Sequence, residues 1–212
     1  MSEPIEAAPA GRGKRHGRAW RRSIPLVVAF LLLTYVGASV VSWQVERYAM
    51  RAYRVPSSGM EPTLHCARPA VGCEADTNDR VLVSRFDALW TPSRGDIVAF
   101  RTPPAAEAKC GTGGTFVKRI VGLPGERVQL RVERGAAFVY VDGRRLEEPY
   151  VEQDRRDSGP GASFTVPRGS YFVMGDNRSQ SCDSRIFGPV PRESFVGPVV
   201  AVYWPVDRIG SA

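Results

Sequence analysis

An uncharged stretch of 20 residues, 24–43, constrains this chain more than any other feature of its sequence. A helix of that length crosses about 30 Å of hydrocarbon, so the stretch predicts a transmembrane helix. Basic side chains crowd its N-terminal flank, where the first 23 residues hold six Lys or Arg against two Glu. By the positive-inside rule, the N-terminal arm then stays in the cytoplasm and the rest is exported. A cleavable secretory signal is the alternative, although its apolar core usually spans only about 7–15 residues.

The composition allows one sizeable folded domain behind this segment. With 43% apolar and 24% charged residues over 212 positions, the chain is not disordered throughout. We expect a basic, disordered cytoplasmic arm (1–23), the transmembrane helix (24–43), a partly helical membrane-proximal neck (44–54) and an exported β-rich domain (55–212). Much of the excess of basic residues lies in the arm, so the net charge of +7 predicts contact with a lipid bilayer rather than with nucleic acid.

Short segments rich in Val, Phe and Tyr follow the neck, and Gly, Pro and Asp turns separate them. This pattern predicts a mainly β, antiparallel domain. The predicted strands are 80–86, 96–101, 115–121, 127–133, 137–141, 170–174 and 199–203. Asp142-Gly143 predicts a hairpin turn, because glycine accepts the positive φ that such a turn requires. Residues 102–114 and 147–163 are interpreted as surface excursions.

All four cysteines lie in the exported part, where thiols usually oxidise. Cys66 and Cys73 enclose a short loop that contains Pro and Gly, and they form the most economical pair, which leaves Cys110 for Cys182. Four cysteines allow three pairings, and the sequence does not choose among them. A zinc site is the weaker interpretation, because the chain has no C-x-x-C pair. We therefore expect no metal.

Lys118 is the most informative titratable residue. Only three of the 29 basic residues are lysine, and Lys118 lies in an apolar strand beside Phe116 and Ile120, which share its face. Unlike a guanidinium, an amine can lose its proton, and burial lowers a lysine pKa from about 10.4 by up to ~3–5 units. A neutral lysine can activate a serine hydroxyl in a chain with only two histidines. The alternative is a surface lysine on an edge strand.

Four segments occur in an order that is informative only when they are read together. They are VPSSGMEPTL (55–64), GDIV (95–98), FVKRIVGLPG (116–125) and GDNRSQSCDSR (175–185). In this order they resemble the bacterial type I signal peptidases. The resemblance implies a membrane-anchored serine endopeptidase that removes signal peptides from exported preproteins by a Ser/Lys mechanism. It also implies an antiparallel catalytic domain outside the cytoplasm, a single-pass anchor in the cell membrane with a cytoplasmic N-terminus, and no cofactor.

The resemblance also assigns roles to residues. Lys118 would be the general base and Ser181 the hydroxyl that orients its amine. The Ser57 hydroxyl and the backbone N–H of Gly59 would form the oxyanion hole, and Met60 would line the substrate pocket, which prefers small side chains. Residues that hold the loop around Ser181 in place would be Asp176, Asn177, Arg178, Asp183 and Arg185.

The chain departs from the family pattern at the nucleophile. The family has its reactive serine immediately before the methionine, where this chain has Gly59. Ser58 is the candidate replacement, although adjacent residues in an extended segment face opposite ways. The alternative is a catalytically inactive relative that binds exported peptides. His65 is the other conceivable base but is interpreted as a loop histidine. A self-cleaving repressor of related chemistry is disfavoured by the anchor and the lack of a DNA-binding helix pair.

Overall fold

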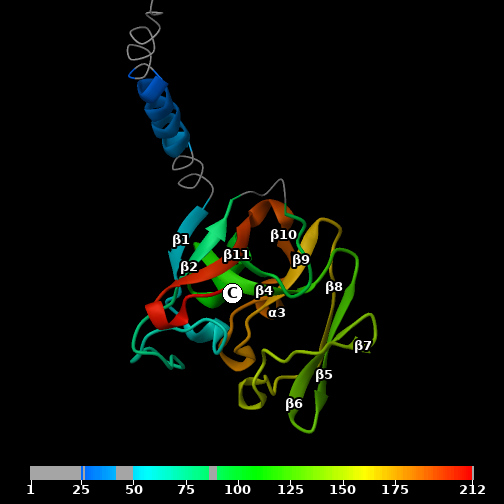
Figure 1. Cartoon of the computed structure of the whole chain (residues 1–212). Helices are drawn as coiled ribbons and strands as arrows, with labels where there is room; N and C mark the ends of the chain where they lie inside the picture. The colour runs from blue at the N-terminus through cyan, green and yellow to red at the C-terminus, as the bar shows by residue number, and fades with distance from the viewer. Residues whose placement is uncertain (1–24, 26, 42–49, 86–89, 212) are drawn as a thin grey trace, which may run out of the picture. The chain divides into compact units, whose positions relative to one another are not determined.

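The structure is a computed structural model that describes residue 25 and residues 27–41, 50–85 and 90–211 (Figure 1). The chain divides into two compact units, Met1–Glu46 and Arg47–Ala212. In the first unit, residues 27–41 are helical. Within the described ranges, no helix has both the length and the apolar character that crossing a membrane requires. The predicted arm (1–23) lies outside the described residues, as do residues 42–49 of the predicted span and neck.

The second unit contains two antiparallel sheets, and Figure 1 shows the smaller one set to one side of the larger. The larger sheet has the strand order β1-β2-β11-β3-β4-β9-β10 and the smaller has β7-β6-β5-β8. The strands are β1 (Met50–Arg54), β2 (Arg80–Ser84), β3 (Ile97–Arg101), β4 (Thr115–Gly122), β5 (Arg127–Glu133), β6 (Ala136–Val141), β7 (Arg144–Arg145), β8 (Ala162–Thr165), β9 (Ser170–Met174), β10 (Val190–Pro191) and β11 (Phe195–Trp204). The mainly β, antiparallel prediction is confirmed.

Short helices connect these strands. The α-helices are α2 (Pro104–Cys110) and α3 (Ser184–Phe187), and the 3-10 turns are η1 (Ser58–Met60), η3 (Gln153–Arg155), η4 (Arg178–Gln180), η5 (Arg192–Ser194) and η6 (Val206–Arg208). The seven predicted strands correspond to β2, β3, β4, β5, β6, β9 and β11. The expectation of a helical neck is wrong at residues 50–54, which pair with β2 and form an edge strand. The two predicted excursions also contain regular structure, namely α2 and part of β8.

The core is arranged so that the middle of the larger sheet is buried on both faces. In β3, Ile97 and Ala99 pack into one apolar cluster, while Val98 and Phe100 pack into a second cluster on the opposite face. This alternation follows from the two-residue period of a strand. A strand buried on both sides gives its neighbour β4, which carries Lys118, a fixed position in the sheet.

The two sheets meet closely at Gly122, the last residue of β4. A Cβ atom at this position would lie 2.5 Å from a methyl carbon of Val128 and 2.9 Å from the Cβ of Phe172. Only glycine permits this approach, so the residue type itself allows the end of β4 to lie against Val128 of the smaller sheet. At the β6–β7 turn, Asp142 and Gly143 have φ values of 49° and 81°, which confirms the predicted hairpin.

Candidate active site

Lys118 projects from β4 opposite Val98 of β3 and is only 6% exposed. Burial lowers the pKa of its amine below the ordinary value of 10.5, although the nearby charges of Asp183 and Asp176 act in the opposite direction. The amine also lies 5.6 Å from the centre of the Phe116 ring. Lys118 makes no ion pair within the part of the chain that the structure describes. The amine is therefore poised toward its neutral form, as a proton acceptor requires.

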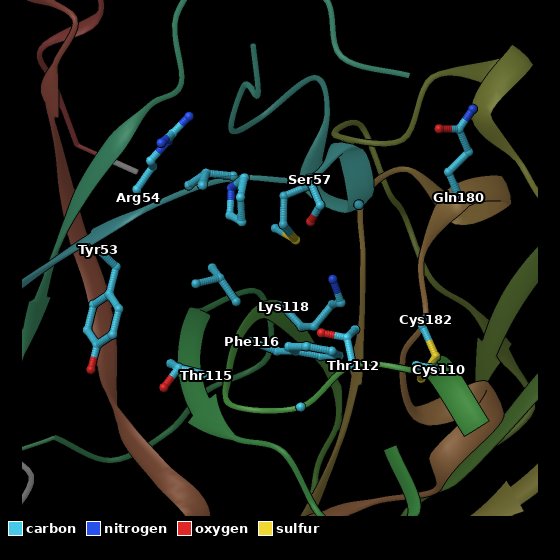
Figure 2. A pocket seen from close by; sticks show the side chains of 16 residues that line it. Tyr53, Arg54, Ser57, Cys110, Thr112, Thr115, Phe116, Lys118, Gln180 and Cys182 are labelled. Carbon is cyan, nitrogen blue, oxygen red and sulfur yellow. A yellow bond between two sulfur atoms is a disulfide. The ribbon is translucent and has the colours of Figure 1, made fainter. Parts of the chain in front are cut away.

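A cavity of about 340 Å³ lies at Lys118. Figure 2 shows Ser57 and Lys118 reaching into it, with Tyr53 and Arg54 at one end and Gln180 at the other. One wall is the chain that leaves β1, and the other is the start of β4 with the segment before it. Lining residues are Tyr53, Arg54, Val55, Pro56, Ser57, Gly59, Met60, Cys110, Thr112, Gly113, Thr115, Phe116, Val117, Lys118, Gln180 and Cys182.

Position 59 faces the lysine directly. A Cβ atom at Gly59 would lie 2.9 Å from Lys118 Nζ and 3.6 Å from Ser181 Oγ. A side chain of residue 59 would therefore start beside the Lys118 amine, at the position where the family pattern places its reactive serine. Glycine supplies no hydroxyl group at this point.

Ser58 points elsewhere. Its hydroxyl donates a 2.9 Å hydrogen bond to Oε1 of Gln180, and Ser58 is not among the residues that line the cavity. Gly72 closes over this pair, since a Cβ atom there would lie 1.9 Å from Gln180 Oε1 and 2.9 Å from Ser58 Oγ. In this structure Ser58 therefore contacts Gln180, and residue 59 is the one that faces Lys118.

Ser181 lies beside Lys118 on a tightly packed loop. Its hydroxyl oxygen is buried and has no hydrogen-bond partner among the described residues. Gly175 makes this packing possible, because a Cβ atom there would lie 2.2 Å from both Ser181 Oγ and the carbonyl oxygen of Gly59. The three segments that carry Gly59, Lys118 and Ser181 thus meet within one small volume.

The remaining predicted pocket residues lie at the same cavity. Ser57 is exposed and in extended conformation just before η1. Met60 both lines the cavity and packs, at 1% exposure, in the apolar cluster with Val55 and Leu64. The chain therefore enters the site from β1 in extended form, turns once through η1 and is anchored in the core immediately afterwards.

Comparison with known proteins shows the family to which this chain belongs. A family model described as signal peptidase, peptidase S26, matches residues 27–204. The chain belongs to this family. A probable signal peptidase I-2 from Synechocystis sp. (strain ATCC 27184 / PCC 6803 / Kazusa) is 38% identical over 179 residues, which cover 84% of this chain and 73% of that protein. Signal peptidase I from Mycobacterium tuberculosis (strain CDC 1551 / Oshkosh) is 30% identical over 258 aligned positions, covering 98% and 84% respectively.

A crystal structure of a signal peptidase I from Enterococcus faecalis V583 also matches this S26 chain. The two share 34% sequence identity, the match covers 52% of this chain and 98% of the other, and the TM-score is 0.41.

In this member of the signal peptidase family, a buried ionic network holds the loop that bears Ser181. Asp183 accepts a 3.0 Å hydrogen bond from the Gly175 N–H and pairs with Arg185, whose guanidinium also donates to the carbonyl oxygens of Arg178 and Ser181. Burial of Asp183 is outweighed by these contacts, and the pKa of its carboxyl is lowered. The Asn177 N–H donates to the Gly59 carbonyl at 3.3 Å, which joins this loop to η1.

Asp176 and Arg178 extend the network away from the cavity. Asp176 accepts hydrogen bonds from Arg119 at 2.9 and 2.7 Å and from the Thr63 hydroxyl at 2.6 Å. Arg178 donates to the carboxylate of Glu148 and to the Gly175 carbonyl. These contacts fix the backbone around Ser181 from two sides.

All four cysteines form disulfides in the structure, Cys66 with Cys73 and Cys110 with Cys182. Their sulfur atoms are therefore not free to bind a metal. His65 contacts Glu61 through Nδ1 and does not line the cavity. Glu61, His65 and Glu74 could together hold a metal ion. Glu61 Oε1, however, already accepts the N–H groups of Cys66 and Glu74, so the cluster is explained as packing of the disulfide loop.

Sequence reasoning missed several residues of this signal peptidase site. Gln180, Glu148 and Thr63 contact site residues that are 122, 30 and 113 positions away in the chain. No local pattern signals such contacts. Gln180 and Thr63 do lie in the quoted segments 175–185 and 55–64, and Gln180 could have been singled out as a polar residue next to Ser181.

Proposed function

We propose that this protein is a signal peptidase I, a serine endopeptidase that removes signal peptides from exported preproteins. Membership of the S26 family and relatives named signal peptidase I across most of the chain support this function. The observation that carries the chemistry is the buried Lys118 amine with its lowered pKa, at the cavity between residue 59 and Ser181. An amine held neutral can accept a proton from a serine hydroxyl without a histidine.

In the proposed reaction, Lys118 takes the proton of the attacking hydroxyl while the serine oxygen bonds to the carbonyl carbon of the scissile peptide. The Ser57 hydroxyl and the Gly59 N–H donate to the developing oxyanion, and one such donor is worth about 3–4 kcal/mol of barrier. The protonated lysine then gives its proton to the leaving amine as the acyl-enzyme forms. Water, deprotonated by Lys118, cleaves the ester and restores the serine.

Ser58 is the proposed nucleophile. Its hydroxyl must first exchange its hydrogen bond with Gln180 for one with Lys118. The short η1 turn and the absence of a side chain at residue 59 favour this exchange, because nothing from residue 59 stands between Ser58 and the amine. Ser181 then serves to orient Lys118, since its buried hydroxyl has no hydrogen-bond partner among the described residues and is free to contact the amine.

The substrate is proposed to bind as an extended strand between residues 53–57 and 115–118. Such a peptide forms main-chain hydrogen bonds with exposed strands, and pockets for alternate side chains give specificity. Met60 would close the floor of the pocket nearest the cut. Small residues, typically alanine, are expected one and three positions before the cut.

Residues 24–43 are proposed to anchor the enzyme in the cell membrane as a single span. Their uncharged length and the basic flank before them support an N-terminus in the cytoplasm and a catalytic domain on the other side. Epitope tags at the two ends test this topology in spheroplasts treated with external protease. Loss of the C-terminal tag alone supports it, and loss of the N-terminal tag contradicts it.

Cleavage of a purified preprotein by the full chain in detergent tests the function. We expect cutting by the wild type and none by Ser58→Ala or Lys118→Ala. Gly59→Ser supplies a hydroxyl group at the position that faces Lys118, at the cost of a shift of a few tenths of an ångström in the flexible end of that lysine. A wild type that never cuts, beside a Gly59→Ser variant that does, would overturn the proposed activity in favour of an inactive relative. Cutting by Ser58→Ala would overturn the role of Ser58 alone.

A further inference from the structure

Next to the start of β4, part of one wall of the cavity is held by a disulfide. Cys110 and Cys182 both line the cavity, together with Thr112 and Gly113. Figure 2 shows the yellow bond between the two sulfur atoms beside Thr112 and Phe116. The opposite wall is the extended chain at residues 53–57. The cavity thus lies between an extended segment and a sulfur-containing arm.

The arm, residues 102–114, is an excursion between β3 and β4. The Thr102 N–H donates to the Gly114 carbonyl at 2.9 Å and closes its base. Helix α2 ends at Cys110, and Gly111 caps it in the left-handed conformation with a φ of 69°. Beyond the disulfide, its tip is tied down by the Lys109 amine, which donates to the Ile186 carbonyl at 2.9 Å. Residues 111–114 are all exposed and include three glycines. Two further hydrogen bonds hold them, from the Gly111 N–H to the Glu107 carbonyl at 3.1 Å and from the Gly114 N–H to the Thr102 hydroxyl at 3.0 Å.

The disulfide also joins the arm to the catalytic loop. Cys182 directly follows Ser181, whose hydroxyl lies 3.6 Å from the Cβ position of residue 59. Both cysteines pack against the apolar cluster that includes Phe116 and Phe187. A polarisable, apolar sulfur pair at this place offers contact area to a side chain but no hydrogen bond to a polar group.

We propose that the Cys110–Cys182 disulfide is a specificity-determining element that limits the substrate side chains beside the cut to small, uncharged ones. This inference rests on the proposed function, because it concerns the peptide that the cavity receives. A covalent tie keeps the arm from moving outward, so a larger side chain meets a wall that does not yield. Without the tie, the glycine-rich tip moves and the cavity widens.

The second disulfide is a matched control. Cys66 and Cys73 are 0% and 7% exposed, are seven positions apart and do not line the cavity. Replacing them removes a disulfide from the same domain without touching the proposed wall.

The test measures peptide binding by the full chain in detergent, by fluorescence anisotropy, and so requires no cleavage. Two labelled peptides differ only in carrying alanine or leucine at the first and third positions before the cut. We expect the wild type to prefer alanine by about tenfold or more. The Cys110→Ser/Cys182→Ser variant should lose most of this preference because the leucine peptide binds more tightly, and the Cys66→Ser/Cys73→Ser variant should keep it. An unchanged preference in the first variant overturns the inference.

A second variant covers the case in which the first fails to fold. Thr112 is exposed and lines the cavity, and Thr112→Phe narrows the same wall with the disulfide intact. We expect at least tenfold weaker binding of the alanine peptide, and unchanged binding overturns the inference. A wild type that binds with the expected preference but never cuts overturns the proposed activity. It still supports the proposal that the Cys110–Cys182 disulfide limits side-chain size. A wild type that binds neither peptide overturns both.

Discussion

Two buried basic side chains in this fold, Lys118 and Arg178, differ in how they are paired. Lys118 is 6% exposed and makes no ion pair within the described residues, whereas Arg178 is 3% exposed and donates to both carboxylate oxygens of Glu148. The Arg178 guanidinium also donates to the Gly175 carbonyl. Lys118 has instead an aromatic ring and a cavity beside it.

This difference in pairing suits the two side chains to different roles. A guanidinium does not lose its proton in a protein, so a buried arginine must be paired, and pairing makes it a fixed strut. An amine can lose its proton, so leaving it unpaired in an apolar setting lowers its pKa and prepares it to accept a proton. The same burial thus favours proton acceptance at the unpaired Lys118 and structural support at the paired Arg178.

The largest expected effect is the loss of activity when the unpaired Lys118 amine is removed. Lys118→Met should lower kcat for preprotein cleavage by about 10²–10⁴, because a positioned general base contributes that much. The variant should fold at least as stably as the wild type at neutral pH, since methionine removes a buried amine whose charged form burial disfavours. Measuring turnover and thermal unfolding on one preparation of the variant checks both the expected loss of kcat and the expected stability. Unfolding of the variant would contradict the assignment of Lys118 to chemistry.

Removing the partner of the paired cation should damage folding instead. Glu148→Ala leaves Arg178 buried without its carboxylate and also removes a contact of Arg156 at 3.3 Å. Breaking one side of a buried pair costs about 3–5 kcal/mol in the free energy of unfolding. Chemical denaturation of the full chain, followed by a signal from the β-rich domain, measures this. A loss below 1 kcal/mol would show that Arg178 does not act as a brace.

The pH dependence of kcat/KM and of the free energy of unfolding should distinguish Lys118 from Arg178 as well. Only the neutral form of Lys118 accepts a proton, so kcat/KM should rise about tenfold per pH unit and level off below 10.5. Stability has the same sign. Between the lowered folded pKa and 10.5 the unfolded chain binds more protons, so the free energy of unfolding rises with pH in that window. This rise should vanish in Lys118→Met, and a rate that falls with pH over the same range would refute the base.

The smallest expected effect lies at an exposed pair. Arg68 and Asp76 form a salt bridge with side chains that are 61% and 87% exposed. Exposed pairs contribute about 0–1 kcal/mol, so Arg68→Ala should change the free energy of unfolding by no more than that. Comparing Arg68→Ala with Glu148→Ala under the same denaturation conditions shows how far burial, rather than pairing itself, determines the loss in free energy of unfolding. A loss of several kcal/mol would break this contrast.

Local patterns predicted most strands of the larger sheet and, in the smaller one, strands β5 and β6 and the hairpin turn that follows β6. Their two-residue alternation depends only on neighbours in the chain, which is why β3 and β4 were placed within a residue. Strand β1 was missed because residues 50–54 are extended only through pairing with β2, about 30 positions later. Helix α2 and strand β8 were hidden in segments whose Gly and Pro content indicates loops.

The site was predicted in part. Lys118, Ser57, Met60 and the loop of Ser181 lie around one cavity, although the hydroxyl of Ser58 contacts Gln180 instead of Lys118. The direction of a side chain within a one-turn 3-10 segment follows from what packs on it, here Gly72 and Gln180. Neither residue is near η1 in the sequence.

The sequence by itself determined that an apolar strand carries a lone lysine, Lys118, and that four cysteines are available for oxidation. It also determined that this chain has glycine where the family pattern has its reactive serine. These properties reside in residue identity and spacing. Only the tertiary structure decided that residue 59 faces the amine, that Arg178 is braced by Glu148 and that a disulfide walls the cavity. Those contacts join segments tens of residues apart, and burial in the folded core is what gives them their energy.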